Sequence, residues 1–375
     1  MTVPQASAAQ NRLLQIERAR HAVMQEGRSM TDVLVHGWYD GTWIERSWRR
    51  CLEKGRRPTE PVGFDVVAPQ QTCRIEEANH VLVNAARPVL EQLGRAIAST
   101  RYFAILTNQA GVVVDAHGPI DRSDPRAAAI TRIGVDLSER SVGTTAIGAA
   151  LTEMQPVWLH RGEHFFQDTS CYSCAGAPLF GPDGALMGML DLTGIDAAER
   201  PELKHLVTQS ARSIENALTL SRPHRLVLRL NWPGRLLGDD DDGLVALDGD
   251  GWVTGSNGAA RQMVAGLASA SHGPVHCSEL FAQPWEPLYD LARHGEQAPT
   301  ELPLWSGLRL CCLAQPAGEA RNGATSHVPL RDVEIALIRK AVSDARGNVM
   351  EAARTLGISR ATVYRKLSQR PGSKA

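Results

Sequence analysis

No part of the 375-residue sequence contains an apolar run of the roughly 18 residues that a membrane-spanning helix needs. The N-terminus also lacks the hydrophobic segment of a secretory signal peptide. The seven cysteines are odd in number and scattered, which argues against a disulfide framework. These absences predict a cytoplasmic protein with reduced thiols and no membrane partner.

The sequence also contains no G-x-x-x-x-G-K-[ST] motif. That motif supplies the backbone amides and the lysine that hold a nucleoside triphosphate. Its absence predicts that the chain does not use ATP, and no other motif predicts a cofactor. The content of 43% hydrophobic and 22% charged residues is ordinary for a globular protein, and the length favours two or three domains.

Residues 348–367, NVMEAARTLGISRATVYRKL, have the spacing of a helix-turn-helix. Asn348 can cap the first helix, and Gly357 can end it because glycine tolerates a left-handed backbone. Ala353 is small enough to stand where two helices nearly touch, and Val363 supplies a core position on the second helix. The pattern predicts a second helix that lies in a DNA major groove.

Polar and basic residues on the second helix are the predicted DNA contacts, since they suit phosphates and guanine edges; they are Ser359, Arg360, Thr362, Arg365 and Lys366. Residues 331–375 hold ten Lys or Arg against four Asp or Glu, whereas the whole chain has a net charge of −1. This concentration of positive charge favours a DNA-binding unit. The alternative is an ordinary helical hairpin with a solvated basic face.

The run AARTLGISRATVYRKL, with the preceding predicted helix over 330–346, resembles the C-terminal Fis-type DNA-binding domain of bacterial regulators. Val333, Leu337 and Ile338 recur on one face of that preceding helix. The resemblance implies that this face pairs with a second chain. We therefore expect an all-α domain over 330–371 that dimerises.

Residues 75–221 have the element order helix, hairpin, helix, three strands, helix. The predicted helices are 75–99, 142–151 and 199–220, and the predicted strands are 103–106, 112–114, 157–160, 177–180 and 186–192. The strings GTTAIGAAL, CAGAPLFGPDGALMGMLDLTG and SIENAL resemble the sensor GAF domain of regulators related to the activator of acetoin catabolism. The resemblance implies an antiparallel sheet with helices on one face and a ligand cavity on the other.

The predicted effector is a small molecule whose identity the sequence does not disclose. Its predicted contacts are drawn from one region of this domain; they are Trp158, His160, His164, Phe165, Cys171, Tyr172 and Cys174. For His164 the alternative is a capped core histidine. Cys171 and Cys174 could be inert core thiols, a redox pair or metal ligands, although no second C-x-x-C completes a metal site.

Residues 1–70 are predicted to be a separate helical segment. Residues 1–30 are compatible with a loose arm or an exposed helix, and Thr42–Leu52 places Ile44, Trp48 and Leu52 on one helical face. The string SWRRCL resembles the segment that precedes the sensor domain in the acetoin-type regulators.

Residues 235–316 have the order strand pair, helices, strand pair, which together with D-x-x-G and S-N-x-A-A-R resembles the PAS unit of the same family. Residues 222–234 are expected to be a connecting segment, and the acidic run Asp239–Asp242 a solvated loop. Cys311 and Cys312 lie on a predicted strand, where neighbours face opposite sides and do not form a disulfide. Residues 317–329 then form a linker to the helix-turn-helix, where the family usually has an ATPase domain.

The fold class expected from these patterns is α+β: a GAF-like and a PAS-like antiparallel sheet, each with helices, followed by a small all-α helix-turn-helix. The predicted function is a homodimeric, effector-responsive transcriptional regulator that binds a double-stranded DNA operator without ATPase activity. RNA polymerase or a paralogous activator could be a further partner. The alternatives are an accessory antagonist of a full-length sigma-54 activator, and a thiol enzyme resembling methionine sulfoxide reductase.

Overall fold

The computed structural model describes residues 8–30, 42–64, 67–268, 273–293 and 299–317, with positions 342, 348–350, 353, 360 and 363 nearer the end of the chain. The chain divides into two compact units, Met1–Ala317 and Gly318–Ala375. Among the described helices, none is both long and apolar enough to cross a membrane.

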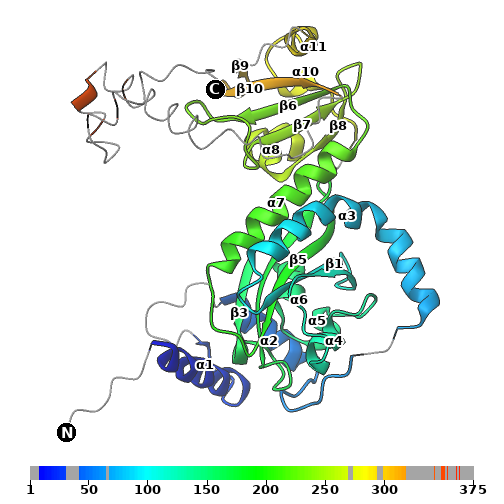
Figure 1. The fold of residues 1–375 in the computed structure, drawn as a ribbon, viewed down its shortest axis with the longest axis vertical. Helices are drawn as coiled ribbons and strands as arrows, with labels where there is room; N and C mark the ends of the chain where they lie inside the picture. The colour runs from blue at the N-terminus through cyan, green and yellow to red at the C-terminus, as the bar shows by residue number, and fades with distance from the viewer. Residues whose placement is uncertain are drawn as a thin grey trace, which may run out of the picture. The chain divides into compact units, whose positions relative to one another are not determined.

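The first sheet contains five antiparallel strands in the order β2-β1-β5-β4-β3. Its strands are β1 (Tyr102–Asn108), β2 (Val113–His117), β3 (Val157–His160), β4 (Tyr172–Phe180) and β5 (Leu186–Ile195). Helices α3 (Pro69–Ala96) and α7 (Leu203–Ser221) run side by side across this sheet (Figure 1). Short helices on the chain between β2 and β3 complete the domain: α4 (Pro125–Ile130), α5 (Glu139–Val142) and α6 (Ala146–Glu153).

Strand alternation gives the first sheet two buried faces. Leu106 and Leu190 belong to the core beneath α3 and α7, whereas Ile105 and Met189 belong to a separate core on the other face. That second core also contains residues of α5 and α6. The expected arrangement, helices on one face and the cavity on the other, is therefore present, but the cavity face carries helices as well.

The N-terminal segment covers this cavity face rather than standing apart from it. In α1 (Ala8–Met24), Ile16, Ala19 and Val23 are at most 2% exposed. In α2 (Thr42–Glu53), Trp48 is fully buried and joins the same core. The predicted amphipathic face of Thr42–Leu52 is confirmed. Over the described residues 8–30, the prediction of a loose arm or exposed helix is wrong, because the apolar side of α1 packs against the cavity face.

One local prediction for the first domain is wrong at its start. The predicted helix 142–151 begins at Ala146 as α6, and Val142 ends the separate helix α5, because Gly143 has a φ of 67° that a helix cannot contain. On α3, Val81 is 46% exposed, whereas its neighbour Leu82 belongs to the core.

The second sheet also has five antiparallel strands, in the order β8-β7-β6-β10-β9. These strands are β6 (Leu226–Asn231), β7 (Gly243–Leu247), β8 (Val253–Ser256), β9 (Thr300–Pro303) and β10 (Arg309–Pro316). Among the described residues between β8 and β9 there are four short helices: α8 (Gly258–Met263), α9 (Ala265–Ala268), α10 (Cys277–Leu280) and α11 (Glu286–Arg293). The two predicted strand pairs are confirmed as the hairpins β7–β8 and β9–β10, and Cys311 and Cys312 are free thiols.

The connecting segment predicted for 222–234 is wrong over Leu226–Asn231, which forms the central strand β6. This strand pairs with β7 on one side and β10 on the other. Leu226, Leu228 and Leu230 alternate into the core, a period-two signal that the flanking prolines obscured.

The acidic run Asp239–Asp242 is only partly a solvated loop. The side chain of Asp242 is fully buried and accepts hydrogen bonds from Asn231 Nδ2 at 3.1 Å and from the Gly238 amide at 2.6 Å. Arg229 lies 3.4 Å from the same carboxylate. Asp242 therefore ties the loop to β6, which explains why it is buried at the end of an otherwise exposed acidic run.

Helix α7 contacts both sheets (Figure 1). Asn216 Oδ1 of α7 accepts a hydrogen bond of 2.7 Å from Asn257 Nδ2, and Asn216 Nδ2 donates to the main-chain oxygen of Asp240 at 3.0 Å. The Ser256 amide donates to Pro182 O at 2.8 Å. The two sheets are therefore joined by buried polar contacts as well as by the chain itself.

In the C-terminal unit, the described residues agree with the helix-turn-helix spacing. Asn348 caps a helix, since its Oδ1 accepts from the Met350 amide at 3.1 Å. Ala353 is 4% exposed and Val363 is fully buried, and the two belong to one apolar cluster with Val342 and Val349. Gly357 and the predicted pairing residues Val333, Leu337 and Ile338 lie outside the described residues.

Candidate functional site

A small cavity of about 30 Å³ opens on the first sheet, on the face covered by α1 and α2. It receives side chains from the segment before α3, from the sheet, from the region around α4 to α6, and from the loop between β3 and β4. Its described lining residues are Phe64, Ile105, Ile130, Leu137, Val142, Thr145, Ala146, Ile147, His164, Thr169, Tyr172, Cys174 and Thr193. None of these carries a formal charge, so the cavity suits an uncharged molecule.

His164 enters the cavity from the turn that follows the short helix η2 (Arg161–Glu163). The turn is held from outside by Arg20 of α1, whose guanidinium donates to the main-chain oxygens of Gly162 at 2.7 Å, of Phe165 at 2.9 Å and of His164 itself. Burial, with a smaller contribution from the Arg20 charge, lowers the pKa of His164 to about 4. The imidazole is therefore neutral at pH 7.

Glu163, directly before His164, also fixes this turn, and its side chain is almost fully buried. Arg12 of α1 donates to its carboxylate at 2.9 Å, and the Trp48 indole donates to the Glu163 main-chain oxygen at 2.8 Å. Burial nevertheless raises the pKa of Glu163 to about 7. Helices α1 and α2 thus position the turn that carries His164.

The sheet side of the cavity carries a chain of polar groups. The Thr193 hydroxyl donates a hydrogen bond to the carboxyl group of Asp191, a fully buried residue on β5. Cys174 Sγ lies 3.5 Å from Thr193 Oγ1. Burial raises the pKa of Asp191 to about 7 and that of the Cys174 thiol well above its usual value.

The two cysteines of the C-x-x-C spacing have raised rather than lowered pKa values. Cys171 and Cys174 are both free thiols. Burial raises the pKa of each, whereas a nucleophilic cysteine needs a lowered pKa. Within the described residues, no three His, Cys, Asp or Glu side chains are grouped so as to hold a metal ion.

Of the seven predicted ligand contacts, the structure brings three together around the cavity: His164, Tyr172 and Cys174. The rings of Trp158 and His160 are stacked, with 6.4 Å between their centres. They lie on the face of β3 that packs toward α3 and α7. They face away from the cavity because alternate residues of a strand point to opposite sides. The remaining two, Phe165 in the core and Cys171 at its edge, do not line it.

Sequence reasoning missed most of the apolar lining. Thr145, Ala146 and Ile147 lie in the GTTAIGAAL string. The resemblance of this string to sensor GAF domains does not by itself indicate which of its residues contact a ligand. Phe64 comes from the segment between α2 and α3, where nothing in the sequence signals a ligand contact. Thr193 stands on β5 opposite Cys174, and the register of the two strands explains their proximity.

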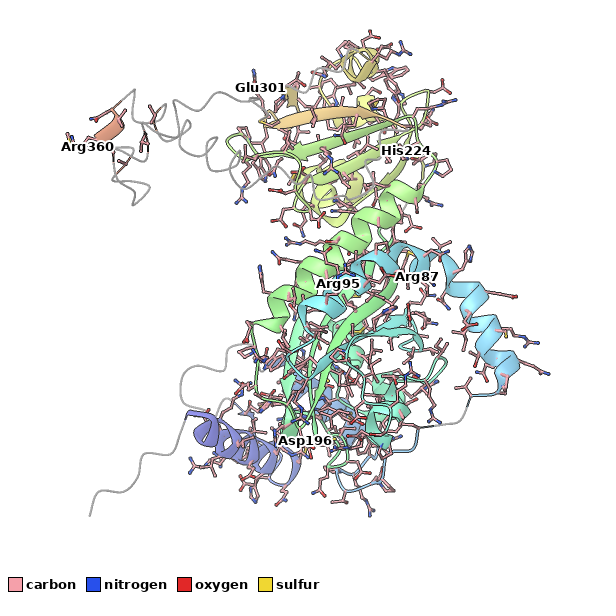
Figure 2. All side chains as sticks on the ribbon, in the orientation of Figure 1. Arg87, Arg95, Asp196, His224, Glu301 and Arg360 are labelled. Carbon is pink, nitrogen blue, oxygen red and sulfur yellow. The ribbon has the colours of Figure 1, made fainter. Side chains whose placement is uncertain are left out.

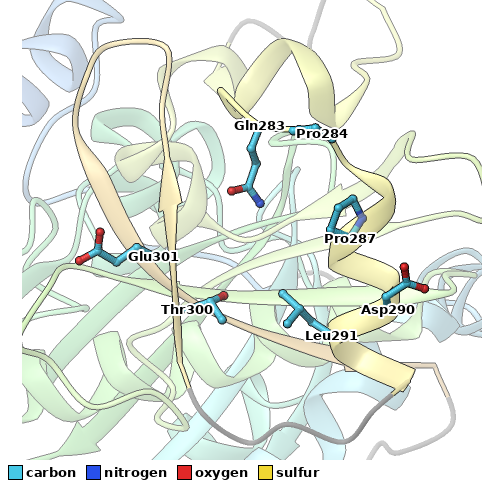
Figure 3. Close-up of a pocket in the computed structure, with 7 residues that line it drawn as sticks. All are labelled: Gln283, Pro284, Pro287, Asp290, Leu291, Thr300 and Glu301. Carbon is cyan, nitrogen blue, oxygen red and sulfur yellow. The ribbon is translucent and has the colours of Figure 1, made fainter.

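A second hollow, of about 390 Å³, lies between α11 and β9 of the second sheet (Figure 3). Its described lining residues are Gln283, Pro284, Pro287, Asp290, Leu291, Thr300 and Glu301. None of the predicted site residues lies there. Residues 294–298, between α11 and β9 in the chain, fall outside the described residues, so we assign no function to this hollow.

Among the predicted DNA contacts, Arg360 is the one described, and its side chain is exposed (Figure 2). It lies on a helical residue three positions before the buried Val363. At these two positions, Arg360 is on the exposed side of the second helix and Val363 is on its buried side. Ser359, Thr362, Arg365 and Lys366 lie outside the described residues.

Comparison with known families agrees with this two-part arrangement. Residues 81–218 match the GAF domain, and residues 329–369 match the family described as bacterial regulatory protein, Fis family. The chain therefore carries a GAF domain and the helix-turn-helix of the Fis family of bacterial regulatory proteins.

The chain is similar to the acetoin catabolism regulatory protein of Cupriavidus necator, with 30% identity over 266 residues, which cover 69% of this chain and 40% of that protein. It is also 30% identical over 176 residues to the acetoin dehydrogenase operon transcriptional activator of Bacillus subtilis, covering 47% of this chain and 29% of that protein. The chain thus spans two fifths or less of the length of these relatives. Among solved structures, the E. coli DhaR(N)–DhaL complex aligns with a TM-score of 0.44 and 17% identity over 73% of this chain and 99% of that one.

The buried Asp191 predicts a specific pH dependence of stability. Its pKa is raised from 3.8 to about 7 in the folded protein, so the folded state keeps a proton that the unfolded state releases between about pH 4 and pH 7. The stability that the protonated Asp191 contributes is fully present below pH 3.8. It is lost as the pH rises toward and through the folded-state pKa of about 7. Asp191→Asn, which cannot ionise, should remove this loss, on the order of a few kcal/mol.

The measurement is urea unfolding of both proteins across this pH range. The difference between their free energies of unfolding isolates Asp191 from His160 and His164, whose pKa values are lowered by burial and which act in the opposite direction. Parallel stability curves for the two proteins would contradict the prediction.

Proposed function

We propose that this protein is a cytoplasmic, effector-responsive transcriptional regulator, in which a small molecule bound in the GAF cavity changes DNA binding by the Fis-type helix-turn-helix. The observation that carries the proposal is the combination in one chain of an internal, uncharged cavity and a basic helix-turn-helix. The relatives named for control of acetoin operons support the same class of function.

DNA binding is proposed through the second helix of the motif. Ser359, Arg360, Thr362, Arg365 and Lys366 would contact phosphates and base edges in a major groove. Because one helix-turn-helix reads one half-site, two copies are needed for an inverted repeat. Val333, Leu337 and Ile338 are the proposed pairing residues.

The effector would act by population shift. A molecule that binds one arrangement of the sensor more tightly than another favours that arrangement by its difference in affinity. The polar junction between α7 and the second sheet offers a route by which this change reaches the rest of the chain. RNA polymerase or a paralogous activator is a further proposed partner, and a role as antagonist of such an activator belongs to the same class.

A thiol-enzyme function has little support. The raised pKa values of Cys171 and Cys174 keep both groups protonated at pH 7. Cys174 is 6% exposed beside Thr193, and Cys171 does not line the cavity. A reductase would need a thiolate that its substrate can reach.

Arg360 should matter for specific DNA binding. If its exposed guanidinium reaches a base edge, Arg360→Ala weakens binding to a selected operator by about 1–3 kcal/mol. Lys374→Ala removes the same charge from the tail and serves as the matched control. Fluorescence anisotropy titrations at fixed salt would measure both, and equal small losses would show that the recognition helix is misplaced.

The regulator is proposed to act without ATP, since the sequence supplies no phosphate loop. A purified preparation should neither hydrolyse ATP nor gain thermal stability from it. ATPase activity that co-purifies with the protein through successive columns would contradict this part of the proposal.

The full-length protein should be a dimer at the concentrations that saturate its operator, and residues 325–375 alone should dimerise more weakly. The reason is that the sensor domains raise the local concentration of the two readers. Sedimentation of both proteins beside DNA titration is the measurement. A full-length protein that remains monomeric while it saturates the operator would refute pairing.

A further inference from the structure

The turn between β4 and β5 of the first sheet is bonded to the second sheet. The Ser256 amide, at the end of β8, donates to the main-chain oxygen of Pro182 at 2.8 Å. The Arg261 guanidinium of α8 donates to the main-chain oxygen of Gly181 at 3.3 Å and also to that of Ser256. The turn at residues 181–184 is therefore a second attachment between the two sheets, in addition to α7.

Glu215 of α7 contacts both sides of this attachment. The residue is 8% exposed, and its Oε1 accepts from the amide of Phe180, the last residue of β4, at 2.9 Å. Its carboxyl group also accepts from the amide of Gly258, the first residue of α8. Burial raises the pKa of Glu215 and lowers that of the neighbouring Arg261. One buried side chain thus joins α7 and the first sheet to the second.

The contacts of Glu215 and of the 181–184 turn with residues 255–261, here called the joint, leave no room for a side chain at Gly255 of β8. A Cβ added there would lie 2.9 Å from Pro182 Cβ. The next nearest atoms belong to α7 and to the residue directly after it. Because carbon atoms in contact are normally about 3.5–4.0 Å apart, a larger residue at this position would press the two sheets apart.

The hairpin that carries the turn also reaches the cavity of the first sheet. Strand β4 begins with Tyr172 and includes Cys174, which both line the cavity, and it ends at Phe180 in the joint. Strand β5 returns from the turn to Thr193, which lines the cavity opposite Cys174. Rigid secondary structure carries a displacement from one end to the other. The β4–β5 hairpin therefore connects the cavity wall to the second sheet.

We propose that α7 and the 181–184 turn hold the two sheets as one rigid body, so that the second sheet moves with the β4–β5 hairpin and not independently of it. Rotation about α7 alone would break the contacts of the turn with Ser256 and Arg261. Rotation about the turn alone would break the 2.7 Å hydrogen bond from Asn257 to Asn216 of α7. This inference goes beyond the proposed function, and its test uses neither an effector nor DNA.

The test is a distance measurement between the two sheets by double electron–electron resonance on the full-length protein. Spin labels are attached through an unnatural amino acid at Arg87 of α3 and Glu301 of β9, two exposed positions (Figure 2), so that the native cysteines stay in place. Dilution into unlabelled protein suppresses distances between copies of the chain. We expect one narrow distance distribution, and a broad distribution or several maxima would overturn the proposal.

Two leucine substitutions in the β7–β8 hairpin separate the joint from the fold of the second sheet. Neither glycine that they replace has a positive φ. Gly255→Leu should abolish the narrow maximum, because the new side chain has no space against Pro182. Gly249→Leu is the matched control and should keep the maximum, since a Cβ there would meet only Arg225 Cγ among the described residues, at 3.9 Å. The same narrow distribution in both variants would overturn the proposal.

Glu215→Gln tests the joint without adding volume, and it decides alone if Gly255→Leu does not fold. Glutamine keeps the shape, but its amide nitrogen cannot accept, so one of the two contacts with main-chain amides is lost. Arg212→Ala is the control on the same helix, because it removes an exposed ion pair with Asp241, and such pairs contribute little. Glu215→Gln should broaden the distance distribution more than Arg212→Ala does. Equal widths for these two variants would overturn the part assigned to Glu215.

Discussion

The burial of the Arg20 guanidinium against the turn at residues 162–165 is the contact on which the sensor arrangement depends. One side chain satisfies the carbonyl oxygens of Gly162, His164 and Phe165, and it lies 5.6 Å from the centre of the Trp48 ring. Burial lowers the pKa of Arg20 to about 10, yet the group remains charged at pH 7. Without it, three acceptors of the turn would lose a charge-assisted partner.

This contact makes the first helix, the turn and the cavity wall one cooperative unit. Arg12, four residues before Ile16, pairs with Glu163 in the same turn, and α2 adds the Trp48 indole. A change in the position of His164 is therefore felt by both N-terminal helices. Arg20 and Trp48 reach the turn through hydrogen bonds to main-chain oxygens, which depend on the path of the backbone more than on the identity of its side chains.

Sequence patterns predicted the elements of the first sheet well, because strands such as Val157–His160 are short apolar runs between clear turns. The capped helix at Asn348 and the buried pair Ala353 and Val363 were also predictable, since local spacing determines them. The docking of α1 was not, because the turn at residues 161–165, which it contacts as well as α2, lies more than a hundred positions away in the chain. Strand β6 was missed because flanking prolines mask its alternation.

For the cavity, sequence reasoning selected polar and aromatic residues close together in the chain, and so it included Trp158 and His160, which the pleat turns to the opposite face. It identified His164, but it could not show which of its nitrogens is engaged. That property follows from one carbonyl oxygen three residues earlier, a tertiary detail without a compositional signal. Phe64 was missed because its place in the cavity wall also depends on tertiary packing and not on a sequence pattern.

The α1 and α2 layer also sets the limits of the smallest autonomous sensor. The family match begins at residue 81, within α3, and a fragment cut there would appear complete by similarity. Such a fragment would lack Trp43, Ile44 and Trp48, which belong to the same core as Phe166 and Val142. The unit that folds is therefore longer than the stretch that matches the GAF domain, and a fragment cut at the bounds of that match would lose part of its own core.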